Sequence, residues 1–367
     1  MTRRRIGVWP SLPVDAYRRP ATDRLPYPLD HPDCRLYERA RQALWQGIRA
    51  MGLQPGDEVL VPAYHHGSEV EALRQAGLVV RYVDITPDME FDPTGLEATL
   101  GPRTRVLYLI HFLGFPQDTA RWRAWCDEHD LLLFEDAAQA WMARDGDAPL
   151  GTLADLAIYC MYKTVGIPDG AAVISKNPPD NPTSTAGMAV FEVAKRHGAW
   201  AAERNGAGAT IFTPLSEFAK WVSERGVDLV AREFDLGDPE SPPSRSSQWL
   251  LPRLADPTIP ERRRANYRFL LDEIGSHVPV GFSELPDGAS PFAFPIQSAD
   301  GEALADQLIG HGVKALLLWK NPHPSLPIEE FPVARHLRDT VIALGVHQEL
   351  TRRELQLMAD VVGDILG

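Results

Sequence analysis

Short continuous apolar runs alternate with amphipathic stretches between about residues 36 and 175. Apolar runs bounded by turn residues predict buried strands, and apolar positions three and four residues apart predict helices. Strands are expected at 58–61, 79–85, 106–111, 131–134, 156–161 and 171–175, and helices at 37–51, 68–75, 93–100 and 118–129. Near-continuous apolar strands separated by helices are typical of a buried, mostly parallel sheet. We therefore expect an α/β fold in which helices flank such a central sheet.

The pattern changes after residue 175. Residues 176–243 begin with a Pro- and Asn-rich stretch and then carry two helical patterns, at about 185–204 and 214–234. We interpret this region as an insertion that caps or borders a ligand site. Its aromatic residues are Phe191, Trp200, Phe218 and Trp221. They could form a local packing stripe, or they could belong to a lid that determines substrate specificity.

The C-terminal region alternates again, which predicts a small α+β domain. Helices are expected at 262–274, 302–310, 332–344 and 351–363, and strands at 292–297 and 313–319. The chain then divides into an N-terminal segment (1–35), a large ligand-binding domain (36–250, including the insertion) and a small domain (251–367).

Composition excludes several classes of protein. The 367 residues can bury a large core, and the net charge of −13 argues against a general binder of nucleic acids or anionic membranes. Cys34, Cys126 and Cys160 are too few and too scattered for a disulfide framework or a metal cluster, so reduced thiols in a cytoplasmic protein are expected. The basic N-terminus precedes no apolar run of signal-peptide length, and no run approaches the ~18 apolar residues of a spanning helix.

Ligands of such sheets lie beyond the carboxyl ends of the strands, so polar residues just after strands are candidates for chemistry. Asp136 stands out, in the run FEDAAQA (134–140) directly after an apolar strand. A carboxylate at this place can cap a helix or stabilise a turn. Alternatively, it can be a buried acid that keeps a pyridine nitrogen protonated, so that the ring becomes an electron sink.

Lys163 is the second candidate, because it follows the apolar strand at 156–161 and precedes a loop rich in Gly and Pro. A lysine after a strand is commonly a solvated strand end. This chain, however, contains only six lysines among 37 basic residues. A lysine desolvated between buried strands is a good nucleophile for a Schiff base with a carbonyl compound.

Several motifs together resemble one family. They are GLQPGDEVLVP, VDITPDMEFDP, HFLGFPQD, EDAAQA and, near the end, ALGVHQELTRREL. The sequence is similar to the DegT/DnrJ/EryC1/StrS aminotransferases, the sugar-aminotransferase branch of the fold-type-I enzymes that use pyridoxal 5′-phosphate (PLP). The resemblance covers about residues 36–175 and, more weakly, residue 245 to the end.

The resemblance implies a role for four residues. Asp136 would pair with the pyridine nitrogen of PLP, and Gln139 would lie near its 3-oxygen. Lys163 would hold the cofactor as a Schiff base and, once displaced, move protons between the substrate and the cofactor. His66 falls where the family stacks an aromatic side chain on the ring, although His65 and His66 are also explained as polar residues at a strand end.

The phosphate end departs from the family pattern. The family's Ser-Gly-Thr triplet is replaced by Arg39, Ala40 and Arg41. A helix N-terminus still favours an anion, and Arg41 could add a bidentate contact, whereas Arg39 could equally be a solvated helix charge. A serine that the family places before the lysine corresponds to Ile158 by direct count, or to Cys160 if the loop is two residues shorter.

The stretch PPSRSSQW resembles the segment with which a neighbouring subunit of the family reaches the phosphate. Arg245 is the best match, while Pro243 stands where the family has an asparagine. The resemblance therefore implies a homodimer with a shared active site.

The expected function is an aminotransferase that moves an amino group to a keto-sugar or a similar cyclic ketone, with glutamate as the expected donor. A PLP enzyme of another reaction class, such as a dehydratase, racemase or lyase, uses the same electron sink and remains an alternative. A non-catalytic member of the family is a third alternative, because the residues expected at the phosphate differ from the family pattern.

Overall fold

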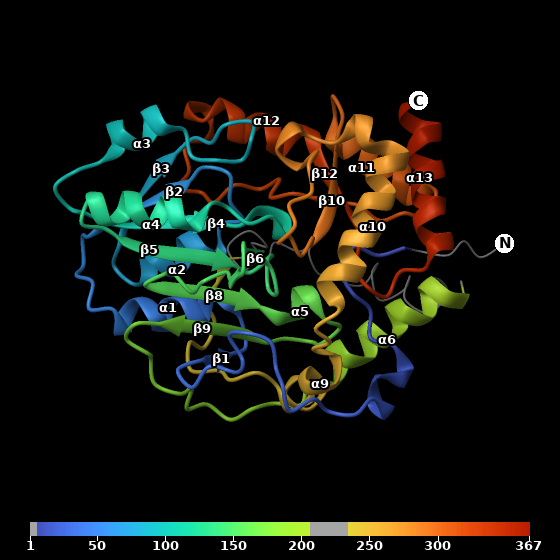
Figure 1. Cartoon of the computed structure of the whole chain (residues 1–367), viewed down its shortest axis with the longest axis horizontal. Helices are drawn as coiled ribbons and strands as arrows, with labels where there is room; N and C mark the ends of the chain where they lie inside the picture. Colours follow the sequence, from blue (N-terminus) through green and yellow to red (C-terminus); the bar gives the residue numbers. More distant parts are fainter. Residues whose placement is uncertain (1–5, 206–233) are drawn as a thin grey trace, which may run out of the picture.

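The computed structural model describes residues 6–205 and 234–367, and a seven-stranded sheet forms its centre (Figure 1). The strand order is β1-β9-β8-β5-β4-β2-β3. The strands are Arg35–Tyr37 (β1), Glu58–Pro62 (β2), Val79–Val83 (β3), Thr104–Ile110 (β4), Leu132–Ala137 (β5), Leu156–Cys160 (β8) and Ala171–Ser175 (β9). Strands β2, β3, β4, β5 and β8 run parallel, whereas β9 is antiparallel to β8 and β1 to β9. The predicted mostly parallel sheet is confirmed.

Helices cover both faces of this sheet, because successive strand residues point to opposite sides. On β4, Val106, Tyr108 and Ile110 join one apolar core, while Leu107 and Leu109 join another. The covering helices are Ala40–Ala50 (α1) and Ser68–Gln75 (α2) on the first face and Pro93–Thr99 (α3) and Thr119–Glu128 (α4) on the second. Burial on both faces explains why the strands read as continuous apolar runs.

The carboxyl ends of the parallel strands meet at one edge of the sheet. In Figure 1 the arrows of β5 and β8 point toward α5 (Met161–Thr164) and the C-terminal elements beyond it. The loops that follow β2, β5 and β8 therefore converge, as the sequence pattern predicts for a ligand site.

The C-terminal part has the α+β character that was predicted. Its antiparallel sheet has the order β10-β12-β11. The elements are Ile259–Ile274 (α10), Ala293–Gln297 (β10), Gly301–Gly310 (α11), Leu316–Leu317 (β11), Pro332–Thr340 (α12), Val341–Gly345 (β12) and Arg352–Leu366 (α13). Among the described residues, no helix has the length and apolar content needed to cross a membrane.

Two predictions for this part are wrong in detail. The helix expected at 332–344 ends at Thr340, and Val341–Gly345 forms the central strand of the small sheet. A fully buried apolar run gives the same sequence pattern in a strand and in a helix, so periodicity could not separate the two. Of the strand expected at 313–319, only Leu316–Leu317 pairs in the sheet, while Val313 makes an isolated bridge with Ile6.

The insertion is described only in part. Its first helical pattern corresponds to α6 (Val190–Asn205), while most of the second pattern, with Phe218 and Trp221, lies outside the described residues. Arg196 on α6 donates hydrogen bonds to the carbonyl oxygens of Pro10 (3.0 Å) and Tyr162 (3.4 Å). The first helix therefore packs beside the loop that carries Lys163.

Candidate active site

A cavity of about 520 Å³ lies where the carboxyl ends of the parallel strands meet. The structure brings most of the predicted site residues to it. They are Ala40, Arg41, His66, Asp136, Gln139, Cys160 and Lys163, and Arg39 and Ile158 line it as well. Side chains from the start of α1, from the ends of β2, β4, β5 and β8, from the N-terminal segment and from the C-terminal part thus surround one space.

Asp136 is the residue before the last of β5, and both of its carboxylate oxygens accept hydrogen bonds. The Tyr108 hydroxyl donates to Oδ2 at 2.7 Å, and the backbone N–H of Ala138 donates to Oδ1 at 2.8 Å. Burial raises the pKa of Asp136, as does the nearby charge of Glu69, while the hydrogen bonds from Tyr108 and Ala138 act in the opposite direction. The contact with Ala138 is a turn interaction, so Asp136 stabilises its own loop and also presents a fixed, buried acid to the cavity.

Lys163 reaches the same space from α5, the one-turn helix after β8. Because β5 and β8 are hydrogen-bonded neighbours, their ends bring Asp136 and Lys163 into one cavity. The lysine is half-buried. The following loop is tightly packed, since a Cβ on Gly166 would lie 2.4 Å from the carbonyl oxygen of Ser11. Backbone packing therefore restricts the loop that follows the lysine.

His66 belongs to the loop between β2 and α2, and Glu69 holds that loop. The backbone N–H groups of His66 and Gly67 donate to the two oxygens of Glu69 at 2.9 and 3.2 Å. Gly67 has a left-handed conformation, with φ of 114°, and a Cβ there would lie 2.6 Å from the ring of Phe234. Burial lowers the pKa of His66 to about 4, so its imidazole is neutral at neutral pH.

Gln139 is oriented by a neighbouring loop. The backbone N–H of Leu113 donates to Oε1 of Gln139 at 2.9 Å. Since the oxygen is engaged as an acceptor, the amide nitrogen is the atom with which Gln139 can donate to an oxygen of a ligand in the cavity.

Positive charge gathers at the beginning of α1. Arg39 precedes the helix, and its guanidinium lies 5.1 Å from the centre of the Tyr162 ring. Its side chain is 32% exposed and lies 3.4 Å from the carboxylate of Glu38, so both interpretations of Arg39 stay predictions. Arg41 is half-buried, and burial lowers its pKa. The N–H groups in the first turn of a helix have no partners within the helix, so this end is suited to an anion.

Cys160 and Ile158 both line the cavity, as residues on the same face of β8. Cys160 is fully buried at the end of the strand, three residues before Lys163. Burial raises the pKa of its thiol, so the group is uncharged at neutral pH. A neutral thiol is only a weak hydrogen-bond donor, unlike the hydroxyl of a serine.

The segment that supplies most of this cavity has known relatives. Residues 38–199 match the DegT/DnrJ/EryC1/StrS aminotransferase family. The match covers less than half of the chain, and this segment is similar to that family. Over 140 residues it is 35% identical to dTDP-3-amino-3,4,6-trideoxy-alpha-D-glucose transaminase of Streptomyces venezuelae, a match that covers 37% of each chain. A second relative, the UDP-N-acetyl-3-dehydro-alpha-D-glucosamine 3-aminotransferase of Acidithiobacillus ferrooxidans, is 24% identical over 87% of this chain and 80% of its own. Most of the curated relatives are matched over less than half of their own length.

Solved structures of aminotransferases of this type share the fold. The sugar aminotransferase CalS13 from Micromonospora echinospora superposes with a TM-score of 0.66 at 20% identity, over 98% of this chain and 99% of that one. The protein Spr1654 from Streptococcus pneumoniae in its PLP form also gives 0.66, at 17% identity, over 99% and 100%. The predicted fold class, the α/β architecture of fold-type-I PLP enzymes, is confirmed.

Several cavity residues lie outside the segment matched to the DegT/DnrJ/EryC1/StrS family, and the sequence analysis missed them. They are Trp9, Phe292, Leu316, Leu317, Trp319, Lys320 and Asn321. Apolar residues on a short or irregular segment carry no chemical signal, which explains most of these omissions. Glu69 was missed within the family segment, although an acidic residue in the first turn of a helix beside His66 could have identified it.

Arg245 also lies beyond the family segment, and it does not line the cavity. It is the first residue of α9 (Arg245–Leu254), where its side chain is exposed. The sequence analysis assigned Arg245 to the site of a neighbouring subunit. That assignment stays a prediction.

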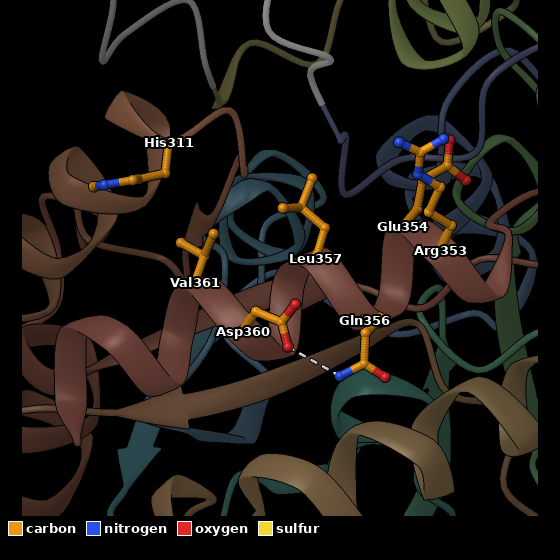
Figure 2. A pocket seen from close by; sticks show the side chains of 7 residues that line it. All are labelled: His311, Arg353, Glu354, Gln356, Leu357, Asp360 and Val361. Atoms are coloured by element: carbon orange, nitrogen blue, oxygen red, sulfur yellow. Dashed lines mark hydrogen bonds between the residues drawn. The ribbon is translucent and has the colours of Figure 1, made fainter.

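A second hollow lies along α13 (Figure 2). Its polar side chains include Asp360, whose Oδ1 accepts a hydrogen bond from Gln356 at 3.0 Å. This hollow lies mainly along one helix, and no lysine is among the residues that line it. We therefore locate the candidate active site at the strand ends.

Proposed function

We propose that the protein is a PLP-dependent aminotransferase that transfers an amino group, from glutamate in the first instance, to a keto-sugar or a similar cyclic ketone. The observation that carries this proposal is the convergence of Lys163 and Asp136 on one cavity at the ends of two neighbouring parallel strands. The family match over residues 38–199 adds weight to it.

The residues of the cavity fit PLP. A buried carboxylate suits the cofactor's pyridine nitrogen, a lysine amine suits its aldehyde, and the arginines at the start of α1 suit its phosphate. When bound, PLP supplies an electron sink that stabilises negative charge at the carbon next to the substrate's nitrogen.

Each residue has a defined task in this proposal. Asp136 holds a proton at the ring nitrogen, and the Tyr108 hydroxyl keeps the carboxylate in place. Lys163 would hold the cofactor through its amine, and the same amine, once released, could take up a proton from the substrate's α-carbon and give it back. The neutral imidazole of His66 would cover one face of the ring, and the Gln139 amide nitrogen could donate to the ring oxygen.

The phosphate is assigned to the first turn of α1, where Ala40 offers space for a close approach and Arg41 offers charge, with Cys160 at the side. We further propose a homodimer, in which Arg245 of each chain completes the other chain's phosphate site. The same proposal includes the division into residues 1–35, 36–250 and 251–367, a cytoplasmic location and a role in biosynthesis.

The acceptor class is supported by the names of relatives. One is a transaminase of a dTDP-linked amino sugar, and another, of Streptomyces kanamyceticus, is an L-glutamine:2-deoxy-scyllo-inosose aminotransferase. The second name gives a cyclic ketone that is not a sugar nucleotide and glutamine as the donor. Glutamate and glutamine therefore both belong in the test.

The test begins with absorbance. PLP added to the protein should produce the visible absorbance of a Schiff base, and Lys163→Ala should abolish it. Glutamate or glutamine should then convert the bound cofactor to its amine form and release the corresponding keto acid. A protein that stays colourless with PLP contradicts the proposal, and a coloured protein that forms no keto acid with either donor points to another reaction class.

A further inference from the structure

Two buried arginines lie behind the walls of the cavity, and the proposed function does not use them. Arg263 on α10 is 1% exposed and Arg338 on α12 is 4% exposed. Neither lines the cavity. Both come from the C-terminal part, whereas Lys163 and His66 come from loops of the central sheet.

Arg263 ties the Lys163 loop to the segment before Phe292. Its Nη2 donates to the carbonyl oxygens of Thr164 (2.9 Å) and Lys163 (3.4 Å), and its Nη1 donates to that of Pro291 (2.9 Å). Pro291 precedes Phe292, which lines the cavity. A single guanidinium therefore holds the backbone of the lysine and the backbone of an opposing wall.

Gln348 completes this arrangement. Its Oε1 accepts from Nε of Arg263 at 3.0 Å, and its Nε2 donates to the Thr164 carbonyl at 3.0 Å. The lysine loop is thus held by two side chains that are themselves hydrogen-bonded to each other, so neither can turn away independently.

Arg338 makes the corresponding connection on the other side. Its Nη2 donates to the carbonyl oxygens of Ala63 (3.0 Å) and His65 (2.9 Å), in the loop that leads to His66. Its Nη1 donates to the carbonyl oxygen of Trp319. Trp319 lines the cavity and has a left-handed backbone, with φ of 57°. Arg338 thus joins the loop of His66 to the segment of Trp319.

The oxygens that accept hydrogen bonds from Arg263 and Arg338 are uncharged. If these positions only had to fill space, burying two charged side chains there would cost free energy of desolvation without need. Burying a guanidinium removes it from water, and an apolar side chain of similar volume would fill the space with a smaller desolvation penalty. A planar fork with five N–H donors can hold several carbonyls at fixed angles, which neither an apolar side chain nor a lysine can do. The arrangement therefore favours a role in fixing backbone geometry.

We propose that Arg263 and Arg338 are paired positioning residues, which fix the Lys163 loop and the His66 loop relative to the C-terminal walls of the cavity. Each guanidinium spans one loop of the large sheet and one wall segment, and the two lie behind different walls. The expected effect on the affinity for PLP rests on the proposed function. The expected effect on backbone hydrogen exchange in the two loops does not.

The first experiment measures backbone hydrogen exchange in the protein without added PLP. Arg263→Gln should increase exchange in residues 161–166 and leave residues 63–67 near the wild-type rate. Arg338→Gln should give the reverse pattern. Arg268→Gln on α10 and Arg335→Gln on α12 are matched controls, because both arginines are exposed on the same helices. Equal exchange in both loops in all four variants would overturn the proposal.

A milder variant guards against loss of the whole fold. Gln348→Ala removes one support of the Thr164 carbonyl but leaves the buried cation in place. It should increase exchange in residues 161–166 by a smaller factor than Arg263→Gln. Arg338→Lys serves the other cluster, since it keeps the charge and loses the fork. If Arg338→Lys restores wild-type exchange in residues 63–67, charge rather than geometry matters there, and the proposal for Arg338 fails.

The second experiment measures PLP affinity by titrating the visible absorbance. Arg263→Gln and Arg338→Gln should each weaken apparent affinity roughly tenfold or more, because displaced loops misplace groups that must act together. The exposed controls should stay within about twofold of the wild type. If wild-type protein binds no PLP, the proposed function fails while the exchange result still stands or falls by itself. If wild type binds PLP and the Gln variants bind it equally well, the positioning role in the cofactor site is wrong.

Discussion

The two ends of the cavity are constructed in different ways. At the end that we assign to the ring of PLP, Asp136 is held by Tyr108 of β4 and by a turn contact in its own loop, and Gln139 is held by the backbone of a neighbouring loop. The chain itself therefore determines where both side chains point. At the phosphate end, the structure offers two arginines, the first turn of α1 and a buried thiol. A ring site defined by geometry tolerates few changes, whereas a phosphate site defined by charge can exchange one cation for another.

The largest effect is expected at the ring end, from Lys163→Ala. Loss of the amine removes the group that carries the proton, so we expect the rate of amino transfer to fall roughly 10²–10⁴-fold. The measurement is the single-turnover rate with PLP-loaded protein. Lys176→Ala is the control, because Lys176 follows the neighbouring strand β9 and has an exposed side chain, which pairs with the buried Asp155. Equal rates in both variants would mean that Lys163 is not the proton carrier.

The stability of the folded protein should depend on pH through His65 and His66, which lie in the loop after β2. Burial lowers the pKa of His65 and of His66 from 6.5 to about 4. The unfolded chain therefore binds more protons than the folded one between these values, so stability is complete above about pH 6.5 and is lost as the pH falls toward 4. Each histidine accounts for at most about 3 kcal/mol.

Thermal or denaturant unfolding of the protein without PLP, followed from pH 7.5 to 4.5, checks this. His66→Phe should flatten the dependence, since one of the two groups no longer takes up a proton. His311→Gln, at an exposed position in the C-terminal part, should leave the dependence unchanged. A wild-type curve that is flat over this range would show that the two imidazoles are not held neutral by the fold.

At the phosphate end, Arg41→Ala should weaken PLP binding without changing the absorbance of the Schiff base. Hydrogen bonds to charged groups are worth about 1.5–3 kcal/mol, which corresponds to a loss of about 10- to 100-fold in affinity. Arg49→Ala is the matched control on the same helix, where the arginine is exposed over Trp45. If Arg41→Ala leaves affinity unchanged while Arg39→Ala lowers it, the phosphate lies nearer the helix entrance than we propose.

The sequence predicted the two ends of the cavity unequally, and for a physical reason. Strand-end positions such as Asp136 and Lys163 follow directly from apolar runs, because the chain direction of a parallel sheet decides which edge they reach. The walls formed by Trp9 and Trp319 depend on how distant segments pack, and no periodicity reports this. Arg263 lies in a helix that the sequence predicts, but nothing in the sequence marks this arginine as buried, and in the structure it is fully buried. Long-range hydrogen bonds to carbonyl oxygens leave no local pattern, since any carbonyl can accept them.

The smallest effect, and the sharpest test of the phosphate end, comes from Cys160. If the thiol lies beside the phosphate, Cys160→Ser introduces a hydroxyl that can donate to it, and PLP affinity should rise about 2- to 10-fold, as expected for one added hydrogen bond. Cys160→Ala should change affinity little, because a thiol donates weakly. The opposite result is equally informative. A buried hydroxyl without a partner costs about 1–3 kcal/mol, so a serine variant that unfolds at lower temperature and binds PLP no better would place the phosphate away from Cys160. The two arginines would then hold it without help from β8, and the phosphate end would depend on charge alone.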